Sequence, residues 1–237
     1  MSKPTRVSLV LGSGGARGYA HIGAIRVLEE RGFEFASVAG SSVGALVGGL
    51  HVAGRLDDFA DWILTLRRVD VLRLLDVSFA SPGVIRAERI AARVRELVGG
   101  MVIEDLPVPF TAVATDLDAR REVWLQRGSL EAAIRASVAL PGIFAPVVLN
   151  GRLLADGGMM DPLPVAPTAA SPSDVTIAIW PGGERGGLPE NAADTGEESS
   201  PDEWAERFRA RRESGTGHRS RPLVAGPVRC RRGGSAG

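Results

Sequence analysis

The sequence has very few of the residues that build disulfide scaffolds or thiolate metal sites. Cys230 is the one cysteine among 237 residues, so the chain can form neither an intrachain disulfide nor a site with several thiolate ligands. Its apolar runs are also short. None approaches the ~20 residues of a transmembrane helix, and residues 7–11 are too few for the apolar region of a signal peptide. We therefore expect a cytoplasmic protein that meets lipid, if at all, at the periphery of the membrane.

Charge of one sign is not in excess either. The 28 basic residues balance the 28 acidic ones, so the chain lacks the global positive charge that would favour nucleic acid as a partner. Apolar residues make up 44% of the chain and charged residues 24%, which are ordinary proportions for a domain that buries a core. We expect one globular domain and no nucleic-acid partner.

The N-terminal part of the chain contains two successive units of strand, glycine-rich turn and helix. Their elements are an apolar strand at residues 7–11, a glycine loop at 12–18 and a helix that ends near Gly32, and then a strand at 35–39, a turn at 40–44 and a helix at 45–52. Two such units favour a sheet of mainly parallel strands with helices on both faces. The pattern predicts an α/β fold.

The rest of the chain is predicted to contain further helices and short strands, followed by a disordered tail. The segments are helices over 55–100 with a break at Ser81–Gly83, strands at 110–115 and 122–126, a helix at 129–138, strands at 147–149 and 152–154 joined by an Asn150-Gly151 turn, and a strand at 175–180. From residue 181 onward the chain holds eleven glycines and ten arginines and no sustained apolar period. That composition is typical of chain that cannot bury a core.

The second glycine-rich turn has the pattern of a nucleophile elbow. Gly40-Ser41-Ser42-Val43-Gly44 fits G-x-S-x-G between a strand and a helix, where a strained backbone exposes the serine hydroxyl at the end of the sheet. The glycines allow the helix to approach the strand closely, and the helix N-terminus favours developing negative charge. The alternative is a glycine-rich turn without chemistry.

The first glycine-rich loop could bind an anion through its backbone N–H groups. One such anion is the oxyanion of a tetrahedral acyl intermediate, and another is a nucleotide phosphate. A dinucleotide fingerprint would place glycine where Arg17 stands and an acidic residue after the second strand, and a Walker loop would need G-K-[ST]. The sequence has none of these features, so nucleotide binding is the weaker alternative.

A nucleophilic serine needs a base, and the histidines are poorly placed for that role. His218 lies in the predicted tail, while His21 and His51 lie inside helices, where we expect packing or surface residues. A carboxylate is then the candidate, and Asp156 follows a short strand in Leu154–Gly158. Its pKa of about 3.9 in water would rise on desolvation, which would make it a better base. Taken alone, Asp-Gly-Gly is most often only a turn.

Taken together, these motifs resemble the patatin-like phospholipases, a family of serine acyl hydrolases with a Ser–Asp dyad. The resemblance covers residues 6–180 and rests on the glycine loop 12–18 with its continuation 20–23, the elbow 40–44, Asp156-Gly157-Gly158, and the intervening blocks 103–110, 114–117, 133–137 and 140–144. It implies a three-layer α/β fold with a central, mostly parallel sheet and helices on both faces. It implies no metal and no cofactor.

The resemblance also implies a role for each motif. Ser42 would attack an ester carbonyl, and Asp156 would take its proton and later activate water. Oxyanion and substrate binding would fall to Gly12, Gly14, Gly15, Ala16, Arg17, Gly18 and Val43, while Gly40 and Gly44 would shape the elbow and Gly157 and Gly158 the aspartate turn. Arg17 would hold a substrate phosphate or order the loop, unless it is simply solvated. The substrate would be a lipid or another acyl ester.

Two further expectations concern a lipid-facing cap and the departure from this family at the C-terminal end. The apolar stretch Trp62–Phe79 is a candidate lipid-facing cap, although packing in the core explains it as well. Beyond the last strand, this chain runs into the glycine- and arginine-rich segment where the resemblance implies further packed helix. The alternative function is therefore a lipid-binding or regulatory protein that keeps the fold and has lost turnover.

Overall fold

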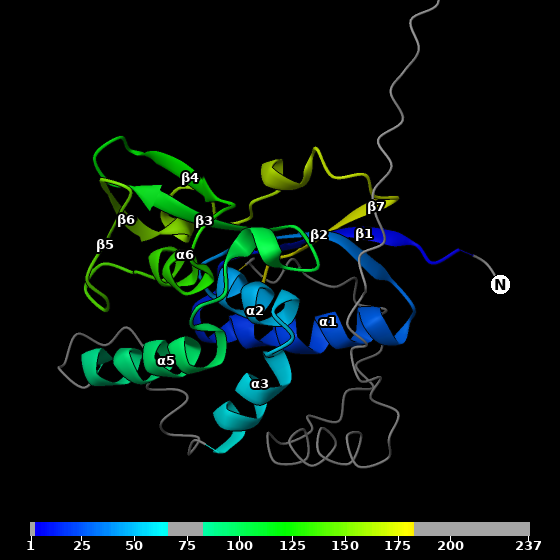
Figure 1. Cartoon of the computed structure of the whole chain (residues 1–237), viewed down its shortest axis with the longest axis horizontal. Coiled ribbons are helices and arrows are strands. Elements are labelled where there is room, and N and C mark those ends of the chain that lie inside the picture. The colour runs from blue at the N-terminus through cyan, green and yellow to red at the C-terminus, as the bar shows by residue number, and fades with distance from the viewer. Residues whose placement is uncertain (1–2, 66–82, 183–237) are drawn as a thin grey trace, which may run out of the picture.

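A computed structural model of the chain describes residues 3–65 and 83–182 (Figure 1). The elements are β1 (Arg6–Leu11), η1 (Gly15–Tyr19), α1 (Ala20–Glu30), β2 (Glu34–Ser41), α2 (Val43–Val52), α3 (Leu56–Thr65), α5 (Gly83–Val98), η2 (Ile103–Asp105), β3 (Phe110–Asp116), β4 (Arg121–Leu125), α6 (Leu130–Ser137), β5 (Val147–Leu149), β6 (Arg152–Asp156), η3 (Gly157–Met159), η4 (Ala166–Thr168) and β7 (Val175–Ile179), where η marks a 3-10 helix. The predicted tail, apart from its first two residues, and most of the stretch Trp62–Phe79 lie outside the described residues.

Both predicted units of strand, turn and helix are confirmed. The second unit is tighter than the sequence indicated, since β2 continues to Ser41 and α2 begins at Val43, which leaves Ser42 as the one residue between strand and helix. The predicted hairpin between β5 and β6 is also confirmed. Asn150 and Gly151 have φ angles of 52° and 73°, as the two central residues of a type I′ turn require.

The sheet has seven strands in the order β5-β6-β3-β2-β1-β7, and β4 also pairs with β3. The pairs β1–β2, β1–β7 and β2–β3 are parallel, while β4 and β6 run antiparallel to β3 and β5 runs antiparallel to β6. Five strands, β1, β2, β3, β5 and β7, therefore point in one direction. The mostly parallel sheet that the sequence predicted is confirmed.

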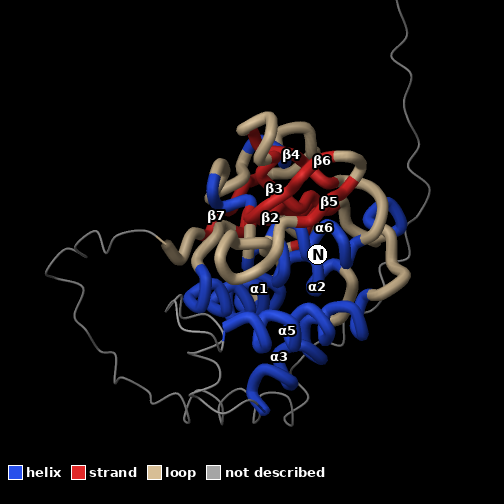
Figure 2. Tube along the Cα trace, turned by 90° about the vertical axis from the view of Figure 1, so that its left-hand side faces the viewer, coloured by secondary structure: helices blue, strands red, loops and turns tan. Residues whose placement is uncertain are grey.

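Three layers result from the direction in which the chain crosses the sheet. The steps from β1 to β2 and from β2 to β3 move the same way, so right-handed crossovers place α1 and α2 on one face (Figures 1 and 2). The return to β7 passes over the opposite face, where η4 packs on β1 and β2. Pro167 stands in the first turn of η4, and Pro172 follows it closely. In the described chain, this face therefore carries a 3-10 turn, because a second proline would interrupt a longer helix.

The core centres on α2, a helix that is buried on nearly every side. Nine of its ten residues are buried, which is typical of a central helix rather than an amphipathic surface one. Its small residues let it lie close to the sheet. A Cβ on Gly48 would be 3.0 Å from a methyl group of Val38, and one on Gly49 would be 2.8 Å from Cδ1 of Ile134. This packing holds the C-terminal half of α2 against β2 and α6.

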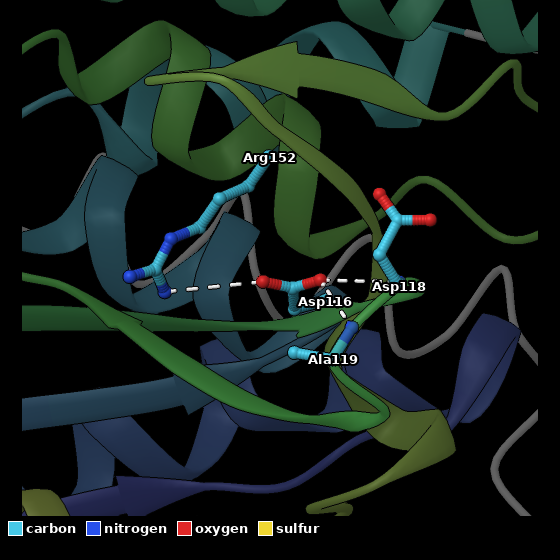
Figure 3. A network of polar contacts seen from close by, with 4 residues as sticks. All are labelled: Asp116, Asp118, Ala119 and Arg152. Atoms are coloured by element: carbon cyan, nitrogen blue, oxygen red, sulfur yellow. Dashed lines mark hydrogen bonds and ion pairs between the residues drawn. The ribbon is translucent and has the colours of Figure 1, made fainter.

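A buried aspartate ends the strand β3 (Figure 3). One carboxylate oxygen of Asp116, Oδ1, accepts the backbone N–H groups of Asp118 and Ala119 at 3.1 and 2.9 Å, while Oδ2 lies 3.9 Å from Nη1 of Arg152 on β6. Asp116 is 4% exposed. These contacts hold the β3–β4 turn and join it to the first residue of β6, which helps to set the register of β6 along β3.

Candidate functional site

Strand β3 brings the ends of β2 and β6 together. Ser41, the last residue of β2, pairs with Val113, and Asp156, the last residue of β6, pairs with Ala114. Because β2 is parallel and β6 antiparallel to β3, both strands end at neighbouring positions of it. Ser42 and Asp156 therefore meet, although 114 residues separate them. The Ser42 hydroxyl donates a hydrogen bond to Oδ2 of Asp156, with 2.6 Å between the oxygens.

The backbone of Ser42 is strained. Its φ of 56° and ψ of −126° lie in a region that non-glycine residues rarely adopt, at a cost of ~1–3 kcal/mol. A buried serine of α6 supports this conformation. Oγ of Ser137 accepts the Ser42 N–H at 3.0 Å and donates to the carbonyl of Val113 at 2.5 Å. Ser137 is thus a functional candidate without an assigned role in the sequence analysis, and the one signal for it was its place in the block 133–137.

The two elbow glycines are required by close backbone contacts. A Cβ on Gly40 would lie 2.5 Å from the backbone nitrogen of Ala45, and one on Gly44 would lie 2.0 Å from the carbonyl oxygen of Leu11. Both distances are far below a normal contact, and the neighbouring atoms belong to the main chain. The glycines of G-x-S-x-G therefore allow α2 to start against β1 and β2, as the motif predicts.

Asp156 is held as a buried acceptor. It is 5% exposed, and its second carboxylate oxygen, Oδ1, accepts the N–H of Gly158 at 2.8 Å. Burial raises the pKa of the Asp156 carboxyl above its usual value, against the hydrogen bonds from Ser42 and Gly158, which lower it. The main chain of Asp156 is fixed as well, since its carbonyl accepts the Thr115 hydroxyl at 2.8 Å and its N–H donates to Ala139 at 2.9 Å.

The glycines that follow Asp156 make room for this arrangement. A Cβ on Gly157 would stand 2.1 Å from the carbonyl oxygen of Val113, and one on Gly158 would stand 2.8 Å from Cβ of Ser13 in the glycine loop. The Asp-Gly-Gly turn is therefore packed between β3 and the loop 12–18. This contact places the aspartate turn beside the loop that was predicted to hold an oxyanion.

The glycine loop lies against the first residue of α2. A Cβ on Gly18 would be 2.0 Å from Cγ1 of Val43, so the loop and the elbow are in direct contact. Gly15 has a φ of 54° and begins η1, while Gly14 caps that helix. Gly15 and Val43 are the first residues of their helices, where backbone N–H groups have no partner within the helix. Such groups are suitable donors for an anion beside Ser42.

Ser42 and Asp156 open onto an apolar pocket of about 110 Å³. Helices α5 and α6 and the segment 138–144 line the pocket, and its lining also includes Gly15 and Val43. Ile90 and Val94 of α5 and Ile134 of α6 supply apolar wall. A nucleophile that lines an apolar pocket suits a substrate with a hydrocarbon chain.

A protein-family model matches the part of the chain that contains this site. The family model described as Patatin-like phospholipase matches residues 9–169, which is more than half of the chain and includes the loop, the elbow and the aspartate turn. The chain belongs to the patatin-like phospholipase family. Its patatin-like region is also similar to proteins of known sequence in bacteria and fungi.

An NTE family protein of Mycobacterium tuberculosis (strain ATCC 25618 / H37Rv) is 54% identical over 207 residues, which cover 87% of this chain and 56% of the relative. Lysophospholipase nte1 of Emericella nidulans is 32% identical over 197 residues, covering 80% of this chain and 13% of that protein. This chain therefore spans about half the length of the mycobacterial relative. The crystal structure of VipD from Legionella pneumophila matches 68% of this chain and 47% of that chain, with a TM-score of 0.44 and 17% identity.

The histidines of the patatin-like domain lie apart from the dyad, as expected. His21 is fully buried, and its Nε2 donates to the carbonyl of Gly12 at 2.9 Å, since a carbonyl can only accept. Burial lowers the pKa of His21, which favours the neutral ring, against the hydrogen bond to Gly12, which raises it. His51 contacts the ring of Phe35 edge-on, and burial lowers its pKa to about 4. His21 thus supports the glycine loop, a contact that the sequence pattern did not reveal.

Arg17 and Ala16 are placed differently from the other loop residues. Both belong to η1, but neither lines the pocket that contains Ser42. Arg17 is exposed, and its guanidinium makes no ion pair with any residue in the described ranges. A role for Arg17 in binding phosphate stays a prediction.

Within residues 3–65 and 83–182, no helix combines the length and the apolar character needed to cross a membrane.

Proposed function

We propose that this chain is a serine lipid-acyl hydrolase in which Ser42 is the nucleophile and Asp156 is its general base. The observation that carries the proposal is the 2.6 Å hydrogen bond from Oγ of Ser42 to Oδ2 of Asp156, both of which line an apolar pocket. Family membership and the similarity to proteins named lysophospholipase support the same reaction class. The patatin-like domain is proposed to extend over residues 6–180.

The reaction begins when Oγ of Ser42 attacks the ester carbonyl carbon while its proton passes to Oδ2 of Asp156. The carbonyl oxygen becomes an oxyanion, which the N–H groups of Val43 and of the loop Gly14–Gly15 stabilise. Asp156 then gives the proton to the departing alcohol oxygen, leaving an acyl ester on Ser42. Burial supports this role, because the raised pKa of Asp156 makes it a stronger base than a solvated aspartate.

The second half of the reaction returns the site to its starting state. Water attacks the acyl carbon on Ser42 and gives one proton to Asp156, and a second oxyanion forms in the same place. When this intermediate collapses, the bond from Oγ to the acyl carbon breaks and the proton moves from Asp156 to Oγ. A carboxylic acid leaves the pocket, and no cofactor is required for the balance.

The pocket favours a substrate with a single acyl chain. A volume of about 110 Å³ is small beside the ~300–1,000 Å³ of drug-sized ligand sites, and its walls are mainly aliphatic. A lysophospholipid or a related one-chain ester fits this space better than a lipid whose two chains must both be buried. The head group would then remain outside, at the solvent end of the pocket. Contact with a membrane surface is part of the proposal for substrates that reside in a bilayer.

Two neighbouring serines allow a matched test. Ser42→Ala removes the proposed nucleophile, while Ser41→Ala removes a buried hydroxyl that has no hydrogen-bond partner among the described residues. We expect release of p-nitrophenol from acyl esters to fall by at least ~10³-fold in Ser42→Ala and to stay near the wild-type rate in Ser41→Ala. Equal rates in the two variants would refute the assignment of the nucleophile.

A fluorophosphonate probe separates the proposed enzyme from a lipid-binding protein that has lost turnover. The alternative to the proposed enzyme is a protein that keeps the fold and binds lipid without hydrolysing it. Labelling of the folded protein at Ser42, with none in Ser42→Ala, supports an active nucleophile. Binding of lipid by folded protein that takes up no label would support the alternative.

A further inference from the structure

The mainly apolar pocket carries one cation in its described lining. Arg135 stands on α6 together with Glu131, and both line the cavity that contains Ser42 and Asp156. Arg135 is exposed, whereas its neighbour Ile134 is buried. Arg135 is therefore accessible from solvent and lines the same pocket as the less exposed Ser42. A solvent-accessible lining residue suits contact with the head group of a one-chain substrate.

The acid closest to Arg135 along α6 is engaged elsewhere. Glu131 precedes Arg135 by four residues, which is the favourable order and spacing for an ion pair within a helix. Glu131 instead contacts Arg95 of α5, with 3.4 Å between Oε1 and Nε. No acidic residue in the described part of the chain pairs with Arg135. The pocket thus presents an unpaired guanidinium.

We propose that Arg135 binds an anionic group, phosphate or carboxylate, of a single-chain lipid substrate while the acyl chain occupies the pocket between α5 and α6. The inference rests on the proposed function and specifies the substrate class. A guanidinium offers several donors in a planar fork that matches two oxygens of a phosphate or carboxylate. A zwitterionic or uncharged head group would gain less from the same residue.

A purely structural role for Arg135 makes a different prediction. Arg135 stands in the last turn of α6, where a cation also interacts favourably with the helix dipole. Removing the charge would then lower stability without changing the preference between head groups. Selectivity, rather than activity or stability alone, is therefore the property to measure.

Binding can be measured without turnover in the Ser42→Ala protein. The ligands are octyl phosphate and octyl glucoside, both kept monomeric, so that the alkyl chain is constant and a lipid surface is absent. We expect octyl phosphate to bind more tightly, and we expect Arg135→Gln to reduce the ratio of the two affinities roughly tenfold. Arg135→Lys should retain part of this ratio, because it keeps the charge and loses the fork.

The matched control is Arg89→Gln. Arg89 is exposed on α5 next to Ile90, a pocket residue, but does not itself line the pocket. We expect the affinity ratio to be the same in this variant as in the parent protein. An equal ratio in Arg135→Gln and in the parent, or an equal loss in Arg135→Gln and Arg89→Gln, would overturn the inference.

Kinetics with short esters that do or do not carry a phosphate distinguish this inference from the proposed function. If Arg135 binds the head group, Arg135→Gln raises KM for the phosphate-bearing ester more than for the neutral one. A Ser42-dependent enzyme in which Arg135→Gln changes both KM values alike would retain the proposed function and reject the head-group site. Selective binding of octyl phosphate by a protein whose wild-type form hydrolyses neither acyl ester would retain the site and reject the enzyme.

Discussion

The two glycine-rich turns of the domain are held in different ways. In the elbow 40–44, every residue except Ser42 is buried, and a Cβ on Gly44 would meet the carbonyl oxygen of Leu11 at 2.0 Å. In the loop 12–18, Gly15 is exposed, and a Cβ added to it would meet nothing within 4 Å. Packing therefore fixes the elbow before any substrate binds. The tip of the loop is constrained mainly by its own backbone conformation, so the two turns should respond differently to the same substitution.

The largest effect is expected from Gly44→Ala. Its Cβ would overlap main-chain atoms of β1, which cannot move without disturbing the centre of the sheet, so we expect a loss of at least ~3 kcal/mol in the free energy of unfolding. Urea denaturation followed by circular dichroism measures it. A stable Gly44→Ala protein would show that the elbow tolerates a shift of α2.

Ser137→Ala tests whether the strained elbow depends on support from α6. The change leaves the N–H of Ser42 without its acceptor, at a cost of ~1–3 kcal/mol. Because the Ser42 hydroxyl would also lose its fixed position, we expect kcat to fall at least roughly tenfold.

The matched control for Ser137→Ala lies at the other end of the same helix. Ser129 caps α6 by accepting the N–H of Ala132 at 3.2 Å, and its removal should cost ~1 kcal/mol of stability while leaving kcat near the wild-type value. Similar kcat values in Ser137→Ala and Ser129→Ala would contradict a positioning role for Ser137.

Gly15→Ala should destabilise the domain much less than Gly44→Ala. Alanine at a φ of 54° costs ~1 kcal/mol, and no atom blocks the new methyl group. Thermal denaturation of the two variants side by side gives the comparison. A loss for Gly15→Ala as large as that for Gly44→Ala would mean that the loop is packed as rigidly as the elbow.

The smallest expected effect is on stability as a function of pH. Burial raises the pKa of Asp156 in the folded protein, so the favourable contribution of this group is present at low pH and is lost as pH rises through that raised pKa. Asp156→Asn should therefore gain stability relative to wild type as pH rises toward neutral. Melting temperatures of both proteins across this range measure the difference, and a difference that shrinks with rising pH would contradict the assignment.

The sequence predicted the parts of this site that are local. The glycine turns stand between apolar segments of strand and helix character, and Asn150-Gly151 specifies its turn directly. The meeting of Ser42 with Asp156 could not be obtained from such patterns, because it depends on the pairing of two distant strands with Val113 and Ala114. The resemblance to a known family supplied the dyad of Ser42 and Asp156 as an expectation.

Contacts between distant segments were also hidden from the sequence. Ser137 reads as an ordinary serine near the end of a helix, and its hydrogen bond to Ser42 exists only because α6 packs beside α2. The same holds for His21, which was expected to be a packing or surface residue within a helix. The sequence did not show that its ring reaches the carbonyl of Gly12. The prediction of helices over residues 55–100 did not show that α5 would form a wall of the pocket.

The most direct test of the central claim is the rate at which a fluorophosphonate labels Ser42, measured against pH in wild type and in Asp156→Asn. The account predicts that labelling of wild type falls as pH drops through the raised pKa of Asp156, because the protonated carboxyl cannot accept the serine proton. In Asp156→Asn, labelling should be slow at every pH. Rapid labelling of folded Asp156→Asn, with the pH dependence of wild type, would contradict the role of Asp156 as the base for Ser42.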